Sequence, residues 1–420
     1  MATSRIKHVV LFPFPGQGHH ASFLTIARLL ARELPDAAIT LVSTPGNVAA
    51  LRSSSSFVPA DHGLPIGCES TSCLPVPSFV TLFEAFESLE PAFDDYVSGL
   101  SGQSGDEADI CIVADVFVAW TVDVAQRHGC AHAVFVSCGA FGTAIFRALW
   151  NHMPALPFGS DDLLRLPEYP DVALHRSQLS PVFLLHAELS DRWTAFYQRA
   201  IRHGYRTDAV LANTVEEFES TGLTMMRRAA GKAPVWPIGP LVRCGNDSSI
   251  DETDDGVLRW LDTHPQSSVL YISFGSQNTI QAKQMTELAA ALESTGRQFI
   301  WAIRPPVGFD VAGAFSDEWL PEGFEAWVGA AAAEQFYNAR MLAEEWGVCA
   351  EVARGNLESS AVERSKVAEA VETVMGDTVE SAAMRRRVKE VQVVLTSAWR
   401  QEEGSSTTAL HEFLRAMHLQ

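Results

Sequence analysis

A histidine in the first glycine-rich turn and an aspartate that ends a later apolar run are the residues whose types suggest catalysis. His19 lies in the turn GQGHHA, between an apolar run and an amphipathic stretch. The positive end of a helix disfavours imidazolium, so the ring stays neutral and able to accept a proton. Asp115 closes the run ICIVAD, where its carboxylate could fix the tautomer of the ring and stabilise its charged form. The two residues form a candidate His–Asp dyad.

Each of these residues also has a structural interpretation. A histidine at a helix start is often only a cap, and an aspartate at a strand end often caps the next helix. The neighbouring His20 is expected to point to a different side of the helix and to be structural. Spacing alone leaves both interpretations of the dyad open.

The same turn formally matches GxGxxA, the fingerprint of dinucleotide-binding proteins. Such a unit also needs an acidic residue at the end of its second strand, but here that strand ends Ser43-Thr44-Pro45. The GxxxxGK[ST] phosphate loop does not occur in the sequence. A dehydrogenase and a P-loop nucleotide triphosphatase are therefore both weak candidates.

A second turn of small residues, SFGS, ends at Ser276, where another apolar run gives way to a helical stretch. Small residues let a backbone approach a ligand closely, and amide groups at a helix N-terminus suit a diphosphate. Turns of this kind are also ordinary in α/β proteins, so this one does not decide the function.

Short apolar runs alternate with amphipathic stretches throughout the first half of the chain. Runs that are apolar on both faces and alternate with helices indicate a parallel sheet covered on both sides. Asn151 to Ser190 shows no sustained period and is expected to be an excursion over the mouth of this domain. The expected strands are His8–Phe14, Ala38–Thr44, Ile110–Asp115, His132–Ser137, Ala209–Thr214 and a run within Val235–Val242.

A polar, acidic segment at residues 244–256 (CGNDSSIDETDDG) is the best domain boundary. It divides a first domain of residues 1–243 from a second of residues 257–420. After it, the apolar runs at Ser268–Ser276 and Phe299–Arg304 restart the α/β pattern.

The pattern then falters, because Pro305 to Glu345 contains no strand-like run. Counting the short run Trp346–Val352 (WGVCAEV), the second domain has about three strands. Three strands are too few for a sheet with helices packed on both faces, so a part of this domain is expected to be missing.

Composition restricts the class of protein. The chain has 420 residues, 47% of them hydrophobic and 20% charged, which is typical of a folded globular protein of two or three domains. The net charge of −20 opposes binding to nucleic acid or to an anionic membrane. No apolar run is long enough to cross a membrane, and the N-terminus lacks the pattern of a signal peptide, so a cytoplasmic protein is expected.

Neither the cysteines nor the histidines follow a metal-binding spacing. The seven cysteines include no CxxC pair, and they are expected to be buried free thiols. The thirteen histidines show no HExxH motif. No metal is therefore expected.

Taken together and in order, eight blocks resemble the plant family-1 UDP-dependent glycosyltransferases. The resemblance covers nearly the whole chain. It implies an α/β protein of two Rossmann-like domains that face each other (GT-B type), with the second truncated and a helix at residues 405–418 packed back toward the first. The blocks are PFPGQGHHASFLTIARLL, ICIVADVFVAWTVDVA, VLANTVEEFE, VLYISFGSQNTI, FIWAIRPP, LPEGFE, EQFYNARMLAEEWGV and EEGSSTTALHEFLRAM.

The resemblance also assigns roles to residues. His19 aligns with the catalytic base and Asp115 with its partner. Four further positions align with residues that bind the donor: Ser276 near the diphosphate, Ser137 near the transferred sugar, and Glu334 and Gln335 at the sugar hydroxyls.

The chain departs from the family within the donor-binding signature. In the segment GFEAWVGAAAAEQFYN, only about ten residues separate the block that precedes the signature from the two residues that end it, Glu334 and Gln335. The tryptophan that stacks on uracil, the diphosphate histidine, the HCGWNS turn and the ribose glutamate have no counterpart. Trp327 does not replace the stacking tryptophan, because nothing downstream of it follows the pattern.

The resemblance implies transfer of a hexose, glucose in the first instance, from a UDP-sugar to a hydroxyl of a small lipophilic acceptor, with inversion. The UDP-sugar is a co-substrate, no cofactor or metal takes part, and the protein is expected to act as a monomer without a partner protein. The alternative is a catalytically inactive protein, from altered splicing, a pseudogene or a mispredicted gene, that retains only acceptor binding.

Overall fold

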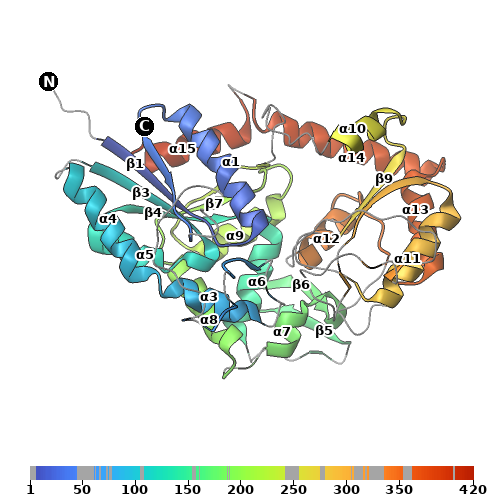
Figure 1. The fold of residues 1–420 in the computed structure, drawn as a ribbon, viewed down its shortest axis with the longest axis horizontal. Helices are drawn as coiled ribbons and strands as arrows, with labels where there is room; N and C mark the ends of the chain where they lie inside the picture. Colours follow the sequence, from blue (N-terminus) through green and yellow to red (C-terminus); the bar gives the residue numbers. More distant parts are fainter. Residues whose placement is uncertain are drawn as a thin grey trace. The chain divides into compact units, whose positions relative to one another are not determined.

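The computed structural model divides into two compact units (Figure 1). The first comprises Met1–Val242, Phe336–Asn338 and Gln392–Gln420, and the second comprises Arg243–Gln335 and Ala339–Val391. The residues described are 6–44, 61, 63–65, 68–71, 74, 78–104, 108–153, 158–159, 161–186, 188, 190–241, 255–274, 280–303, 305–306, 316, 319–320, 335–352, 362–400 and 403–420. Most of the predicted linker, residues 244–254, lies outside them.

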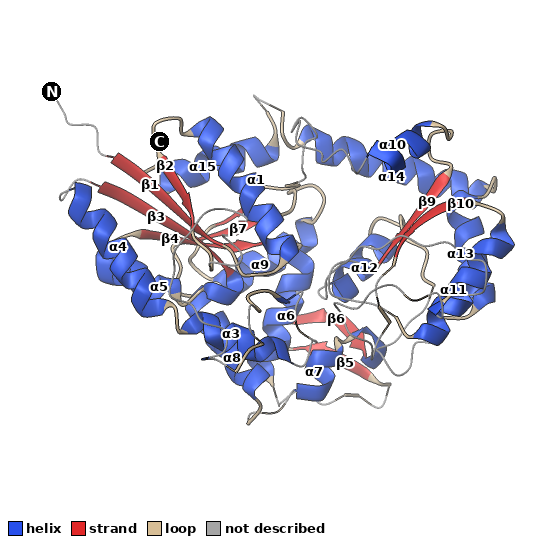
Figure 2. Ribbon diagram, in the orientation of Figure 1, coloured by secondary structure: helices blue, strands red, loops and turns tan. Residues whose placement is uncertain are grey.

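A six-stranded parallel sheet forms the centre of the first unit, and Figure 2 shows its strands in red. The strand order is β2-β1-β3-β4-β7-β8, and each neighbouring pair is parallel. All six apolar runs expected to be strands are confirmed. They are β1 (Ile6–Phe12), β2 (Ala38–Leu41), β3 (Ala108–Asp115), β4 (Ala131–Val136), β7 (Ala209–Ala212) and β8 (Val235–Pro237).

Helices cover both faces of this sheet, as its doubly apolar strands require (Figure 1). Helices α1 and α15 pack on one face, whereas α6 and α9 pack on the other, over β4, β7 and β8. The helices of this unit are α1 (Gln17–Glu33), α3 (Phe79–Glu87), α4 (Glu90–Ser104), α5 (Thr121–His128), α6 (Ala140–His152), α7 (Pro181–His186), α8 (Arg192–Gly204), α9 (Ser220–Ala230) and α15 (Ser405–Ala416).

The excursion at residues 151–190 contains regular structure that its sequence pattern did not predict. Strands β5 (Leu163–Leu166) and β6 (Tyr169–His175) form an antiparallel hairpin, and α7 follows. Leu164, Leu166 and Leu174 are fully buried, whereas Arg165, between the first two, is exposed. A four-residue strand carries too few residues to establish a period by itself.

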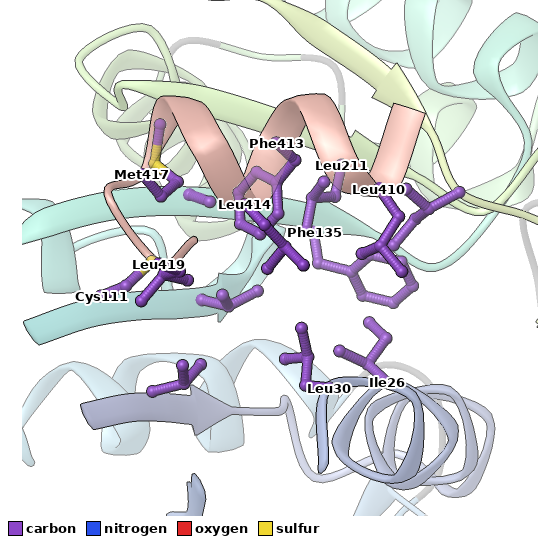
Figure 3. Close-up of a cluster of buried hydrophobic side chains, with 14 of the residues drawn as sticks. Ile26, Leu30, Cys111, Phe135, Leu211, Leu410, Phe413, Leu414, Met417 and Leu419 are labelled. Carbon is purple, nitrogen blue, oxygen red and sulfur yellow. The ribbon is translucent and has the colours of Figure 1, made fainter. Parts of the chain in front are cut away.

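The last helix completes the core of the first unit. In Figure 3, Leu410, Phe413 and Leu414 of α15 face Ile26 and Leu30 of α1, together with residues of the strands. Phe413 is fully buried, and its ring lies 5.7 Å from that of Trp236 at 69°. The first unit is therefore built from both ends of the chain.

A buried polar network holds the start of β4 beside β7. His132 is 1% exposed, and its two ring nitrogens lie 3.0 Å from Thr121 Oγ1 and 2.9 Å from Thr207 Oγ1. Its backbone N–H donates to the carboxylate of Asp208 at 2.9 Å. Burial, with a smaller contribution from His203, lowers the pKa of His132 to about 3 from 6.5.

The second unit has its own smaller core. Its described strands form a two-stranded parallel sheet, and α11 and α13 pack around Trp301 of β10. Its elements are α10 (Asp255–Asp262), β9 (Val269–Ser273), α11 (Ala282–Thr295), β10 (Gln298–Ala302), α12 (Gln335–Glu344), α13 (Arg364–Met375) and α14 (Val379–Ser397), the last of which runs on into the first unit.

The prediction of a third strand in the second domain, at Trp346–Val352, is wrong. Gly347 has a positive φ of 60°, and the N–H of Val348 donates to the carbonyl of Leu342 at 3.0 Å. These residues end α12 as a left-handed C-terminal turn, so they do not extend into a sheet. Cys349, which follows this turn, is exposed, and the expectation that it is a buried thiol is also wrong.

No helix within the described ranges is long and apolar enough to cross a bilayer.

The packing of α15 predicts the effect of shortening Phe413. Phe413→Ala should lower the free energy of unfolding of the first unit by about 3 to 5 kcal/mol, because it removes a fully buried ring and leaves a cavity. Val393→Ala, at a position that is 60% exposed, is the control and should change it by less than about 0.5 kcal/mol. Urea unfolding curves of the two variants measure the difference. Equal midpoints would show that α15 is not part of this core.

The depressed pKa of His132 predicts loss of stability in acid. The unfolded chain takes up a proton near pH 6.5 that the folded chain binds only near pH 3. Between these values, protonation of this histidine in the unfolded chain should lower the free energy of unfolding by up to about 1.4 kcal/mol for each unit by which the pH falls. His132→Gln keeps hydrogen-bonding capacity without titrating. Its free energy of unfolding should therefore fall less steeply between pH 6 and 4, and parallel curves for the two proteins would contradict the assignment.

Candidate active site

The candidate catalytic residues meet at the carboxyl edge of the parallel sheet. Strands β1, β3 and β4 are neighbours. His19 lies in the first turn of the helix after β1, Asp115 is the last residue of β3, and Ser137 is the first residue after β4. Because parallel strands end at the same edge, residues far apart in the sequence come together there.

His19 and Asp115 form a direct contact. His19 Nδ1 lies 2.6 Å from Asp115 Oδ2, with Asp115 fully buried and the side chain of His19 17% exposed. Asp115 Oδ1 accepts from the backbone N–H of Phe117 at 3.1 Å, at the start of a short 3-10 helix. The capping and catalytic interpretations of Asp115 are therefore compatible, since a different oxygen serves each.

The carboxylate also determines where the proton lies on the imidazole. A carboxylate only accepts hydrogen bonds, so the Nδ1 atom that faces Asp115 carries the hydrogen. The lone pair of the neutral ring is then on Nε2. This tautomer can accept a proton at Nε2 while Asp115 stabilises the resulting imidazolium.

Ser137 contacts the same ring nitrogen. Its Oγ lies 3.3 Å from His19 Nδ1, a longer contact than that of Asp115. The structure thus brings together three of the six predicted site residues.

Small and aromatic residues enclose the imidazole. A Cβ atom on Gly16 would stand 2.9 Å from His19 Cδ2, so only glycine lets the ring lie this close to the turn. The rings of Phe14 and Phe117 lie 5.5 Å and 5.8 Å from that of His19. Phe117 is half-buried, which leaves an aromatic surface next to the histidine.

His20 has different surroundings from His19. Its Nε2 atom lies 3.4 Å from the Oγ of Ser43, two residues after β2. Burial and the neighbouring His19 lower the pKa of His20, and Asp115 opposes them with a smaller effect. A neutral His20 adds no positive charge next to the ring that takes up the proton.

The other three predicted site residues cannot be placed as side chains. Ser276 and Glu334 lie outside the described residues. Gln335 is the first residue of α12. Among the residues that the structure does describe, no group of histidine, cysteine, aspartate and glutamate is arranged to hold a metal ion.

Asn213 was not predicted from the sequence as a site residue. It is the first residue after β7, at the same sheet edge, and its Nδ2 donates to the carbonyl of Ser137 at 3.1 Å. A polar residue at the end of a predicted strand was the available signal: Asn213 is the second-last residue of the run Ala209–Thr214, and Asp115 and Ser137 end their own runs.

Comparison with known proteins identifies the family. UDP-glycosyltransferase 92A1 of Arabidopsis thaliana is 30% identical over an alignment that covers 98% of this chain and 97% of the relative. Crocetin glucosyltransferase 3 of Crocus sativus is 34% identical, with 85% and 89% covered. The chain belongs to the plant UDP-glycosyltransferases. No protein-family model matches it.

Solved structures of plant UDP-glycosyltransferases show the same GT-B fold. UGT73P12 of Glycyrrhiza uralensis superposes with a TM-score of 0.78 at 23% identity, covering 98% of this chain and 96% of that one. UGT71G1 of Medicago truncatula, solved with UDP-glucose, gives a TM-score of 0.74 at 19% identity, with 98% of each chain covered.

This family member is shorter than its relatives. The alignment with the Arabidopsis protein runs over 482 positions, whereas the chain has 420 residues. The relative therefore contains residues without a counterpart here.

The contacts of Asp115 predict the tautomer of His19. In Asp115→Asn the amide oxygen still accepts from Phe117, so the amide NH₂ faces His19 Nδ1. This donor should move the ring proton to Nε2. The ¹⁵N chemical shifts of the imidazole report the change, and Asp94→Asn, next to His128, is the matched control that should leave His19 unaltered. Unchanged shifts in Asp115→Asn would refute the assigned hydrogen bond.

Proposed function

We propose that this UDP-glycosyltransferase transfers a hexose from a UDP-sugar to a hydroxyl group of a small lipophilic acceptor, with inversion. The observation that carries the proposal is the contact of 2.6 Å between His19 Nδ1 and the fully buried Asp115. This contact directs the lone pair of a neutral imidazole to Nε2, where a hydroxyl proton can be received.

The proposed reaction begins with the acceptor. Nε2 of His19 takes the proton of the hydroxyl as its oxygen attacks the anomeric carbon from the face opposite UDP. The bond from that carbon to the diphosphate oxygen breaks, and UDP leaves with the electron pair. Asp115 stabilises the imidazolium during this step, and the attack from the opposite face inverts the configuration.

The surroundings of His19 support an apolar acceptor. Phe14 and Phe117 stand beside the imidazole, and Phe117 stacks on Phe83 at 5.3 Å with an interplanar angle of 15°. Aromatic surface next to a base suits a phenol or a lipophilic alcohol. Glucose is the proposed sugar, because the Crocus relative is named a glucosyltransferase.

The donor residues are proposed from resemblance alone. Ser276 would contact the diphosphate, Ser137 the transferred sugar, and Glu334 with Gln335 the sugar hydroxyls. The UDP-sugar is a co-substrate in this scheme, and a monomer without cofactor or metal suffices. Residues 1–243 would then bind the acceptor and residues 257–420 the donor.

A second candidate function is acceptor binding without transfer. Two observations favour it: the alignment is longer than the chain, and the described part of the second unit has only a two-stranded sheet. Loss of three hydrogen bonds to a charged diphosphate, at about 1.5 to 3 kcal/mol each, would weaken donor binding by roughly three orders of magnitude or more.

Donor binding separates the two candidates. We would titrate the purified chain with UDP and with UDP-glucose by calorimetry, and use a version with a restored donor signature as the control. Micromolar binding by the natural chain supports transfer. No binding up to millimolar donor, while the control binds, supports the non-catalytic candidate.

The proposed role of His19 predicts a loss of rate. His19→Ala should reduce sugar transfer by about 10²- to 10⁴-fold, because it removes the general base, and should leave UDP-glucose binding within about twofold. His128→Ala, a histidine that pairs with Asp94 elsewhere in the same unit, should keep full activity. Initial rates with a phenolic acceptor test this. Transfer by His19→Ala at the natural rate would exclude His19 as the base.

A further inference from the structure

The turn between β4 and α6 is held in place by side chains from the segment after β7. Strands β4 and β7 are adjacent and parallel, so the residues that follow them lie next to each other. The backbone N–H of Asn213 donates to the carbonyl of Val136 at 3.0 Å, and its side-chain Nδ2 donates to the carbonyl of Ser137 at 3.1 Å. One residue thus binds two successive carbonyls at the end of β4.

The amide group of Asn213 has a single orientation that satisfies its neighbours. Its Oδ1 accepts from the backbone N–H of Leu241 at 2.8 Å, while its Nδ2 faces the carbonyl of Ser137. A flipped amide would direct two donors at each other on one side and two acceptors on the other. The side chain is therefore fixed at both ends.

A second side chain from the same segment holds the other end of the turn. Glu219 is 2% exposed, and its Oε2 accepts from the N–H of Ala140 at 2.7 Å, at the start of α6. Gly139 leaves room for this carboxylate, since a Cβ atom there would stand 2.7 Å from Glu219 Oε1. Residues 137–140 are thus anchored at both ends, and Ser137 has little freedom to move.

We propose that Asn213 is a positioning residue of the active site, which holds the backbone of Ser137 so that its hydroxyl stays against Nδ1 of His19. Asn213 acts through Ser137, whose carbonyl it binds. The inference rests on the proposed function, because the position of Ser137 matters for catalysis only if His19 is the base.

The contact that Asn213 maintains is sensitive to small shifts. Ser137 Oγ lies 3.3 Å from His19 Nδ1, already at the long end of a hydrogen bond. Movement of the turn by a few tenths of an ångström would break it. Nδ1–H would then keep Asp115 as its partner but lose the second oxygen that shields it.

Asn213→Asp is the selective test. Aspartate has the same shape and still accepts from Leu241, but it presents a second acceptor to the carbonyl of Ser137 in place of the donor. We would measure the rate at which the His19 Nδ1 proton exchanges with water, by NMR, in Asn213→Asp, Ser137→Ala and the double variant. Asn151→Asp, whose amide donates to the hydroxyl of Tyr205 at the surface, is the matched control.

Exchange should be about tenfold faster in Asn213→Asp and in Ser137→Ala, the size expected for one lost hydrogen bond. The double variant should exchange no faster than Ser137→Ala, because Asn213 acts only through Ser137. The control should match the natural chain. Additive effects in the double variant would show that the new charge acts on His19 directly and would overturn the proposal, as would unchanged exchange in Asn213→Asp.

Two further measurements keep the result interpretable. If Asn213→Asp does not fold, Asn213→Ser, which is uncharged and shorter, should give the same tenfold increase. Sugar transfer is assayed in parallel: a fall in kcat with an unchanged KM for the acceptor is expected where the chain is active. If the natural chain transfers no sugar, the proposed function fails, while the exchange rates still decide whether Asn213 positions Ser137.

Discussion

The burial of the Asp115 carboxylate is the constraint on which the site depends. A carboxylate removed from water is costly unless strong donors surround it. Here the two donors are the ring of His19 and the backbone N–H of Phe117. Each lies where it does because β1 and β3 are adjacent parallel strands whose chains turn into helices at the same edge. The requirement to satisfy one buried charge therefore sets the orientation of the imidazole and the conformation of the turn after β3.

A second constraint comes from the path of the chain. Helix α15 fills a face of the first sheet with Phe413 and Leu414, both fully buried, so the first unit is complete only when the C-terminus has returned to it. A relative cut off at its end would lose that face. A chain shortened inside the second unit keeps it. The alignment with the Arabidopsis protein runs over 482 positions and covers 98% of this chain and 97% of the relative, so residues of the relative without a counterpart here lie within the aligned region.

The sequence predicted the first sheet from simple patterns, and the same patterns made His19 and Asp115 a candidate pair that the family resemblance then favoured. Runs such as ICIVAD are apolar on both faces, and a polar residue at the end of such a run must lie at the carboxyl edge. The hairpin β5–β6 was not predicted, since the four residues of β5 are too few to show a period. The run Trp346–Val352 was misassigned because valine and cysteine suit a strand, whereas Gly347 turns the chain out of α12.

The position of Asn213 could not be derived in the same way. Its role depends on which strands are neighbours, and a sequence pattern gives the order of strands along the chain without their order in the sheet. Strand β7 lies next to β4 in the sheet, although β5, β6 and helices α7 and α8 lie between them in the chain and outside this sheet. The contact of His19 with Asp115 also joins strands that are not consecutive, β1 and β3, but it could be inferred from the edge that parallel strands share, whereas the hydrogen bonds of Asn213 depend on which strand lies next to β4.

The two parts of the proposed reaction, proton removal by His19 and donor binding, depend on two units with separate hydrophobic cores. Every contact described for His19 comes from α1, β1, β3, β4 or the turns that follow those strands, and all of these lie in the first unit. The second unit has a different core, around Trp301. Loss of residues from the second core removes none of the interactions that orient His19. An intact dyad is therefore no measure of donor binding, and the geometry of the base would persist in a protein that had ceased to transfer sugar.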